Sequence, residues 1–171
     1  KESERRLYRG EKISMIFQDS LSALNPVFPV GAQIAEMFRV HRKMGKKEAT
    51  ERAIELMDRV RIPAARERVN NYPHEFSGGM RQRIMIAMAI ANDPRVLIAD
   101  EPTTALDVTI QAQVMELLKS AQEMLGAATV LITHEMHVVR KICHRVAVME
   151  NGRIVEEGPV LDVFTRPQQP I

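Results

Sequence analysis

Two stretches decide the fold of this chain: Phe76-Ser77-Gly78-Gly79-Met80-Arg81-Gln82-Arg83 and Val96-Leu97-Ile98-Ala99-Asp100-Glu101-Pro102. In the first, a serine and two glycines open a helix, and the unpaired N–H groups of a helix start attract anions. The second is an apolar strand that ends in two carboxylates, which suits one magnesium ligand and one base that orients a water. Together the two stretches predict a site for a nucleoside triphosphate.

The usual phosphate-binding loop, G-x-x-x-x-G-K-[ST], is missing from the sequence, because none of the eight glycines has the required spacing. The chain also begins with Lys1 rather than with methionine. We therefore expect these 171 residues to be an interior piece of a nucleotide-hydrolysing protein, cut off upstream. Without the loop, we expect this chain alone to bind ATP poorly and to hydrolyse it negligibly.

Strands alternate with helices along the sequence, which predicts an α/β fold with a largely parallel sheet. The helical segment before Gly78 is punctuated by Pro63 and Pro73, and Gly45 suits the C-terminal cap of its first helix. Asn151-Gly152 predicts a type I′ hairpin turn. Strands are expected at 13–17, 96–99, 129–133, 145–149 and 153–157, and long helices at 80–91 and 109–125. The strands at 96–99 and 129–133 have the composition of strands buried on both faces.

The composition excludes several classes of protein. A formal net charge of +2 is too balanced for a nucleic-acid-binding surface. No apolar run approaches the about 18 residues that a membrane span needs, and no signal peptide is recognisable at the start. The single cysteine, Cys143, excludes an internal disulfide and suits a reducing compartment.

Polar side chains at the ends of the predicted strands are the candidate reactive groups. Asp100 would hold Mg²⁺, and Glu101 would accept a proton from the attacking water. Because open α/β sheets bind ligands at the carboxyl ends of their strands, we expect His134 to lie near Asp100. A neutral imidazole there would bond a phosphate or the lytic water, and the Gln18 carboxamide would offer its oxygen to Mg²⁺.

Each of these candidates also has a plainer interpretation. The two carboxylates would simply be solvated, and His134 would be a surface or helix-capping residue. Ser77 and Asp107 would be ordinary N-caps of the helices that follow them. A plain N-cap explains Ser77, but it does not explain two consecutive glycines, each of which costs conformational entropy.

Five motifs occur in order along the chain, and together they resemble the nucleotide-binding subunit of an ATP-binding cassette (ABC) transporter. They are Gln18, Phe76-Ser77-Gly78-Gly79-Met80-Arg81-Gln82, Leu97-Ile98-Ala99-Asp100-Glu101-Pro102, Thr104-Ala105-Leu106-Asp107 and Thr133-His134-Glu135. The dipeptide/oligopeptide/nickel importer branch is most closely resembled by Ile16-Phe17-Gln18-Asp19, Leu24-Asn25-Pro26 and Tyr72-Pro73-His74-Glu75-Phe76. The resemblance covers nearly the whole chain.

The fold that the resemblance implies is a partial P-loop NTPase (RecA-like) parallel sheet core with an inserted all-α helical subdomain. The implied segments follow the motifs. They are the end of an N-terminal catalytic part with the glutamine loop (1–30), the helical subdomain (31–77), the signature helix and α/β catalytic core (78–158) and a C-terminal tail (159–171).

The resemblance also implies a role for each matching position. Gln18 would link Mg²⁺ and the lytic water to the membrane subunits. Asp100 would be the Walker B aspartate that holds Mg²⁺, and Glu101 would be the catalytic base. His134 would be the switch histidine, and Asp107 would belong to the D-loop across a dimer interface.

Ser77, Gly78 and Gly79 would form the signature motif, which contacts the γ-phosphate of ATP bound to the opposite subunit of a head-to-tail dimer. Met80 follows them where the wider family commonly has glutamine. The loop after Gln18 and the helices around residues 31–60 would form the groove that receives a coupling helix of the permease.

The implied function is that of an ATP-hydrolysing subunit that powers an importer of di- or oligopeptides or nickel, with ATP and Mg²⁺ as cofactors. Its partners would be a second nucleotide-binding subunit, the membrane permease and, indirectly, a solute-binding protein, with no nucleic acid. It would be a peripheral protein at the cytoplasmic face of the inner membrane.

Two alternatives stay open: a non-transport ABC ATPase, and an inactive binding fragment. The chromosome and repair types of ABC ATPase insert a long coiled coil between the glutamine loop and the signature. The stretch from Gln18 to Ser77 has prolines and no sustained heptads, which argues against those types.

Overall fold

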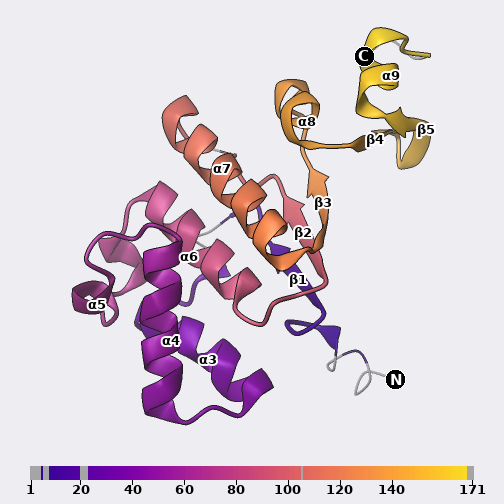
Figure 1. Ribbon diagram of the computed structural model, residues 1–171. Coiled ribbons are helices and arrows are strands. Elements are labelled where there is room, and N and C mark those ends of the chain that lie inside the picture. Colours follow the sequence, from indigo (N-terminus) through magenta and orange to yellow (C-terminus); the bar gives the residue numbers. More distant parts are fainter. Residues whose placement is uncertain (1–4, 6–7, 20–22, 105, 169–171) are drawn as a thin grey trace. The chain divides into compact units, whose positions relative to one another are not determined.

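A computed structural model describes residues 5, 8–19, 23–104 and 106–168 of the chain. These residues form two compact units, Lys1–Ile132 and Thr133–Ile171. Figure 1 shows the order of helices and strands along both units, which are described separately below.

The first unit is built on a three-stranded parallel sheet. Its strands are β1 (Ile13–Ile16), β2 (Val96–Asp100) and β3 (Ala128–Ile132), with β2 in the middle. Ile16 pairs with Ala99, and Asp100 pairs with Ile132. The three carboxyl ends therefore meet at one edge, and the predicted parallel α/β architecture is confirmed.

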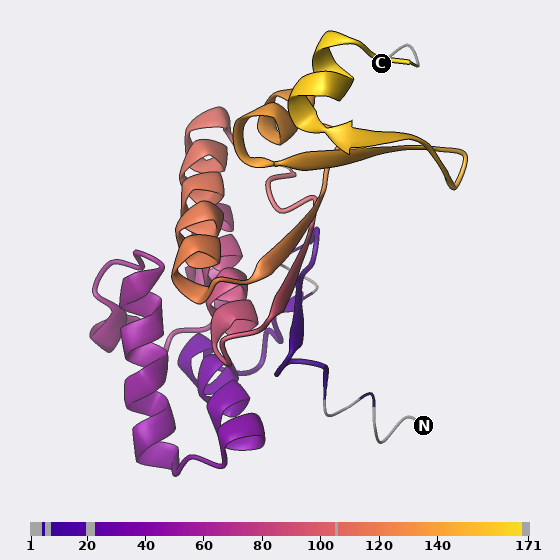
Figure 2. The same ribbon diagram turned by 45° about the vertical axis from the view of Figure 1, so that its right-hand side comes forward.

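Helices of the first unit fall into two groups. A helical segment separates β1 from the signature stretch, and two longer helices then flank β2 in the sequence. The segment contains α3 (Val30–Arg42), α4 (Lys46–Arg59), α5 (Ala65–Arg68) and the 3-10 helix η1 (Pro73–Glu75). The flanking helices are α6 (Gly78–Ile90) and α7 (Val108–Leu125), which lie on the same side of the sheet in Figures 1 and 2.

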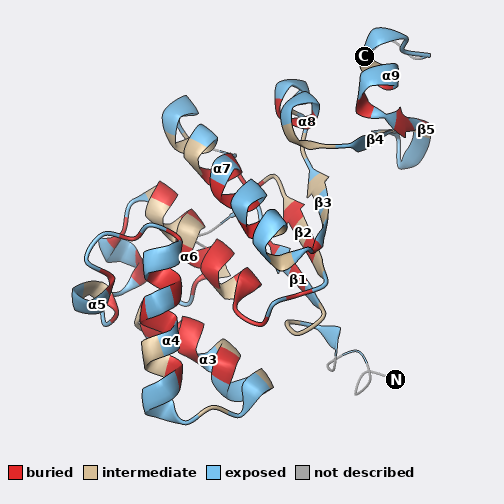
Figure 3. Cartoon of the chain, in the orientation of Figure 1, coloured by how far each residue is buried: buried red, intermediate tan, exposed pale blue. Residues whose placement is uncertain are grey.

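The core lies between the sheet and these two helices. Fully buried side chains come from the inner sheet face and from both helices, and Figure 3 shows the buried positions of α3 and α4 continuing this core. They include Ile16, Leu97, Ile84, Ile86 and Val114. Because α6 is apolar nearly all round, it can contact the sheet, α7 and α3 at once.

The expectation that residues 129–133 form a fully buried strand is wrong. In β3, Val130 is 51% exposed and Ile132 is 47% exposed. On the same face of β1, Ile13 and Met15 are also exposed, whereas Leu97 and Ala99 of β2 point into the core. More buried and more exposed side chains alternate along each strand, because successive side chains point to opposite faces and α6 and α7 cover the same face of the sheet.

The expected C-terminal cap at Gly45 is also wrong. Helix α3 ends earlier, at Arg42, and Lys43 adopts the left-handed conformation with φ 54°. Gly45 has φ −64° and is the N-cap of α4. The left-handed residue is the one directly after the last helical turn, so it is not the glycine two positions further on.

The second unit contains α8 (Met136–Ile142), β4 (Arg145–Glu150), β5 (Arg153–Pro159) and α9 (Val160–Thr165). Strands β4 and β5 form an antiparallel hairpin. Asn151 and Gly152 at its tip both have positive φ, 47° and 77°, as the predicted type I′ turn requires.

Partial burial raises the pKa of the Cys143 thiol above its ordinary value, so the reactive thiolate is disfavoured.

Gly31 marks a close contact between α3 and the segment after α5. Its N–H donates to the carbonyl of Val69 at 3.0 Å. A Cβ at this position would lie 2.1 Å from Val69 Cγ2 and 2.5 Å from the Val69 carbonyl oxygen. No flexible side-chain end can move aside to relieve the backbone clash.

We therefore expect Gly31→Ser to lower the free energy of unfolding by about 2 kcal/mol or more, since overpacking a core costs about 1–3 kcal/mol. Gly45→Ser is the matched control, because Gly45 has open space around it and serine is a favoured N-cap. Urea unfolding of both variants measures the difference. Equal destabilisation of the two would contradict this packing argument.

Candidate functional site

Three of the predicted site residues follow strands of the parallel sheet. Asp100 is the last residue of β2, and Glu101 comes directly after it. Gln18 lies two positions beyond the end of β1. Since β1 and β2 are parallel neighbours, the sheet delivers all three residues to one edge.

A hydrogen bond at this edge joins Gln18 to Glu101. The Gln18 amide donates a hydrogen bond from Nε2 to Oε2 of Glu101 at 2.9 Å. The two residues are far apart in the sequence, so only the pairing of β1 with β2 brings them together. A carboxylate and a carboxamide in direct contact supply the oxygen ligands and the hydrogen-bonding groups that a hydrated magnesium–phosphate group needs.

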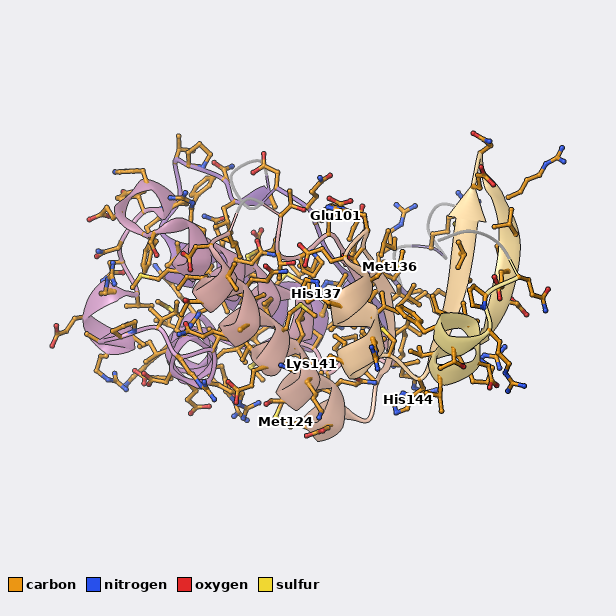
Figure 4. All side chains as sticks on the ribbon, turned by 90° about the horizontal axis from the view of Figure 1, so that it is seen from above. Glu101, Met124, Met136, His137, Lys141 and His144 are labelled. Carbon is orange, nitrogen blue, oxygen red and sulfur yellow. The ribbon has the colours of Figure 1, made fainter. Side chains whose placement is uncertain are left out.

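Glu101 has an unusual backbone conformation. Its φ is 42°, a left-handed value that a residue with a side chain adopts at a cost of about 1–2 kcal/mol. Its N–H donates to the Ile132 carbonyl of β3 at 2.9 Å, which holds the turn against the sheet. Glu101, which directly follows the end of β2, is labelled in Figure 4. Strained residues that are held in this way concentrate at functional sites.

Thr104 belongs to one of the five motifs, but the sequence suggested no role for it, and the structure places it in contact with Glu101. Its hydroxyl donates to Oε2 of Glu101 at 2.8 Å, and its N–H donates to the Glu101 carbonyl at 3.2 Å. The signal was present in the sequence, because Pro102 after Glu101 favours a turn that brings a residue three positions on back to the start. The hydroxyl at that position is the part that we overlooked.

The signature stretch begins α6 as predicted. Ser77 is the N-cap, and its Oγ accepts a hydrogen bond from the N–H of Met80 at 3.3 Å. Behind it, Arg68 lies over the ring of Phe76 with 4.4 Å between the guanidinium carbon and the ring centre. Arg68 also donates to the Glu75 carbonyl at 3.0 Å and to the Met80 sulfur at 3.5 Å. The start of α6 is thereby anchored to α5.

The two glycines of this stretch have different surroundings. Gly78 is partly exposed, and an added Cβ would meet only ordinary contacts, at 3.8 Å from Leu106 and 3.9 Å from Arg81. Gly79 is buried, and an added Cβ would lie 2.5 Å from Cγ2 of Ile110 in α7. Close helix packing therefore explains Gly79, whereas nothing in the described packing requires glycine at position 78.

Asp107 caps α7, as its plainer interpretation proposed. Its Oδ1 accepts a hydrogen bond from the N–H of Ile110 at 3.0 Å. The contacts of the two glycines show that residues 106–110 lie against the start of α6. The first unit therefore brings the signature stretch and the segment around Asp107 together.

His134 belongs to the second unit, where it is exposed. It follows the end of β3 by two positions, and the N–H of the next residue, Glu135, donates to the Thr133 hydroxyl at 3.1 Å. The proximity of His134 to Asp100 stays a prediction.

A second feature of the first unit is a loop held by Gln33 of α3. The buried Gln33 side chain accepts from the N–H of Asn25 and donates to the carbonyls of Asn25 and Phe28, each at 2.9 Å. This clamp leaves Val27 69% exposed and Phe28 54% exposed. The N–H of Val30 donates to the Asn71 carbonyl at 2.9 Å, so the exposed Tyr72 is on a neighbouring segment.

Within the part of the chain that the structure describes, no group of three or more His, Cys, Asp or Glu residues could hold a metal ion. Magnesium in nucleotide sites is bound by one or two carboxylates together with the phosphates, so Asp100 and Gln18 fit such a site as far as their chemistry goes. Among the same described residues, none of the helices combines the length and the apolar character needed to cross a bilayer.

Residues 2–104 match the sequence profile of the family described as ABC transporter. The chain belongs to the ABC transporter family. It is 53% identical over 169 residues to the probable peptide ABC transporter ATP-binding protein y4tR of Sinorhizobium fredii (strain NBRC 101917 / NGR234), covering 99% of this chain and 50% of that protein. It is also 53% identical over 169 residues to the oligopeptide transport ATP-binding protein OppD of Bacillus subtilis (strain 168). That match covers 99% of this chain and 47% of OppD.

Solved structures show the same fold. The ATP-binding cassette MJ0796, solved as a dimer in a post-hydrolysis state with ADP and Pi, superposes with a TM-score of 0.81 at 29% identity. The match covers 94% of this chain and 68% of that one. This ABC chain spans about half the length of the curated relatives it matches.

Gly78 and Gly79 offer a test that separates packing from ligand contact. We expect Gly79→Ala to destabilise the ABC chain by about 1–3 kcal/mol, because the new Cβ overlaps Ile110. Gly78→Ala should not lower the free energy of unfolding by more than about 0.5 kcal/mol, since its Cβ meets only normal contacts and alanine favours a helix.

Urea unfolding measures both variants. The double variant Gly79→Ala/Ile110→Ala should recover part of the loss that Gly79→Ala causes, after the cost of Ile110→Ala alone is subtracted. If Gly78→Ala destabilised the chain as much as Gly79→Ala, the distinction between the two glycines would be wrong.

Proposed function

We propose that this ABC chain supplies the signature motif and the hydrolytic carboxylate of an ATP-hydrolysing subunit that powers an importer of the peptide class. The observation that carries the proposal is the hydrogen bond from Gln18 to Glu101, which joins two strand ends of the parallel sheet at 2.9 Å. The similarity to proteins titled as peptide and oligopeptide ATP-binding proteins supports the solute class.

In the proposed reaction, water attacks the γ-phosphate of ATP in line with the leaving oxygen. Glu101 accepts the proton of that water, and Asp100 and Gln18 would hold Mg²⁺. The metal would supply neutralisation of the charge on the phosphate oxygens. His134 stabilises the same charge from the end of β3. The donor chemistry at the carboxyl ends of β1 and β2 supports these roles for Gln18, Asp100 and Glu101.

The signature residues act on a nucleotide held by a second subunit. Ser77 and Gly78 are at the start of α6 with exposed or partly exposed surface, so their backbone N–H groups are accessible to an anion. Met80 belongs to the same turn, and Gly79 allows α7, with Asp107 at its start, to pack closely. The related cassette MJ0796 is titled as a dimer, which supports a head-to-tail pair.

The loop clamped by Gln33 is the proposed docking surface for a coupling helix of the membrane permease. Val27, Phe28 and Tyr72 expose apolar side chains on adjoining segments, and the Gln33 clamp holds the loop in place. The subunit would sit at the cytoplasmic face of the inner membrane as a peripheral protein, with a solute-binding protein as an indirect partner and no nucleic acid.

A chimera tests the proposed function directly. The chain replaces the matching 169 residues of OppD in Bacillus subtilis, where oligopeptide uptake and the ATPase activity of the purified chimera are measured. We expect the chimera to support both. Glu101→Gln should reduce ATP hydrolysis by about 10²-fold or more, because a positioned general base contributes about 10²- to 10⁴-fold.

Glu116→Gln is the matched control, since Glu116 is an exposed carboxylate on α7 whose ion pair with Arg61, at 3.4 Å, lies outside the site. Its ATPase activity should equal that of the unmodified chimera. Unchanged hydrolysis in Glu101→Gln, or a chimera that neither transports nor hydrolyses, would refute the proposal.

The 171 residues contain no phosphate-binding loop, and this absence predicts weak binding of ATP. We expect the 171-residue chain alone to bind MgATP with a Kd above about 1 mM by isothermal titration calorimetry. Gln18, Asp100 and Glu101 would contact the metal and the γ-phosphate, but they offer no cradle for the other phosphates. Tight, Mg²⁺-dependent binding of ATP by the isolated chain would contradict this expectation.

A further inference from the structure

One oxygen of Glu101 receives hydrogen bonds from two donors. Gln18 Nε2 reaches Oε2 at 2.9 Å, and the Thr104 hydroxyl reaches the same atom at 2.8 Å. A carboxylate oxygen has about two acceptor sites, so Oε2 accommodates both bonds. The two bonds restrict the position of Oε2 and therefore limit the rotation of the carboxylate.

The two donors differ in how they are attached. Gln18 follows β1, on a segment separate from the one that carries Glu101, and it is exposed. Thr104 is on the same turn as Glu101, and its own N–H donates to the Glu101 carbonyl at 3.2 Å. The Thr104 bond therefore moves with Glu101 and persists wherever Gln18 goes, whereas the Gln18 bond depends on the pairing of two separate segments.

The turn that carries Thr104 is well supported. Pro102 and Thr103, between the two residues, are buried, and the N–H of Leu106 donates to the Thr103 carbonyl at 3.2 Å. The strained backbone of Glu101 is held by its hydrogen bond to Ile132. A buried proline and these backbone bonds place the Thr104 hydroxyl at a definite position, which a positioning group requires.

We propose that Thr104 is a positioning residue: its hydroxyl keeps the Glu101 carboxylate oriented toward the attacking water whether or not Gln18 is bonded to that carboxylate. This inference rests on the proposed role of Glu101 as the base. Thr104 is not needed as a helix cap, because Asp107 caps α7. The Thr104 side chain is exposed and adds little to the core, so packing does not explain it. The contact that its hydroxyl makes is the bond to Glu101.

The OppD chimera described above provides the kinetic test. Because a positioned base contributes about 10²- to 10⁴-fold, we expect loss of its anchor in Thr104→Val to lower kcat by about tenfold, with KM for ATP changed less than about twofold. Thr104→Ser keeps the hydroxyl and should restore most of kcat. The double variant with Glu101→Gln should be no slower than Glu101→Gln alone, because Thr104 acts through Glu101.

Thr165→Val is the matched control. Its hydroxyl also makes a short local bond, to the Leu161 carbonyl at 2.7 Å, but it belongs to α9 and makes no bond to Glu101. Normal kcat in Thr104→Val, or a loss that Thr104→Ser does not restore, would overturn the positioning role. A rise of KM alone would overturn it as well, since it would indicate a role in binding.

A second measurement does not depend on the chimera. In the 171-residue chain, NMR signals of the Gln18 side-chain amide report on the carboxylate that it contacts. We expect Thr104→Val to shift these signals and Thr104→Ser to leave them in place. Unshifted signals in Thr104→Val would refute the inference even if the chimera were active. An inactive chimera with shifted signals would refute the proposed function but support the anchoring of Glu101 by Thr104.

Discussion

The parallel pairing of β2 with β1 and β3 is the constraint on which the rest of this ABC chain depends. Parallel strands end at the same edge, so the pairing delivers Gln18, Asp100 and Glu101 to one place although the chain between them is long. It also supplies the Ile132 carbonyl that holds the Glu101 N–H. If the register of β1 on β2 slipped by one residue, Ile16 would leave the core, and Gln18 would no longer reach Glu101.

The second constraint is the close approach of α6 to α7. Gly79 lets Ile110 pack against the helix start, and this contact sets the position of Asp107 relative to Ser77. The two glycines thus serve different needs, although they are adjacent. The close packing of α7 explains Gly79. Gly78 is partly exposed at the start of α6, where the proposed contact with a ligand would form.

Much of the architecture was predictable, because strand composition, capping residues and turn signals act over short distances. The order of strands and helices, the hairpin turn at Asn151-Gly152 and the caps at Ser77 and Asp107 agree with the prediction. The two wrong predictions concern how far a strand is buried and where a helix ends, not which segments are helices or strands. An apolar strand such as β3 has the same composition whether one face or both are covered, and the cap after α3 depended on where the helix stopped, not on the nearest glycine.

The sequence by itself determined the family of this chain, the order of its helices and strands and the candidate residues for binding phosphate or magnesium, because motifs, capping residues and turn signals are local patterns of the sequence. Only the tertiary structure decided which of those residues touch. The hydrogen bond from Gln18 to Glu101 and the close contact of Gly79 with Ile110 depend on distances between segments that are remote in the sequence. The hydrogen bond from the Thr104 hydroxyl to Glu101 depends on the conformation of the turn that carries both residues. Such distances are set by packing and strand register, which no single segment specifies.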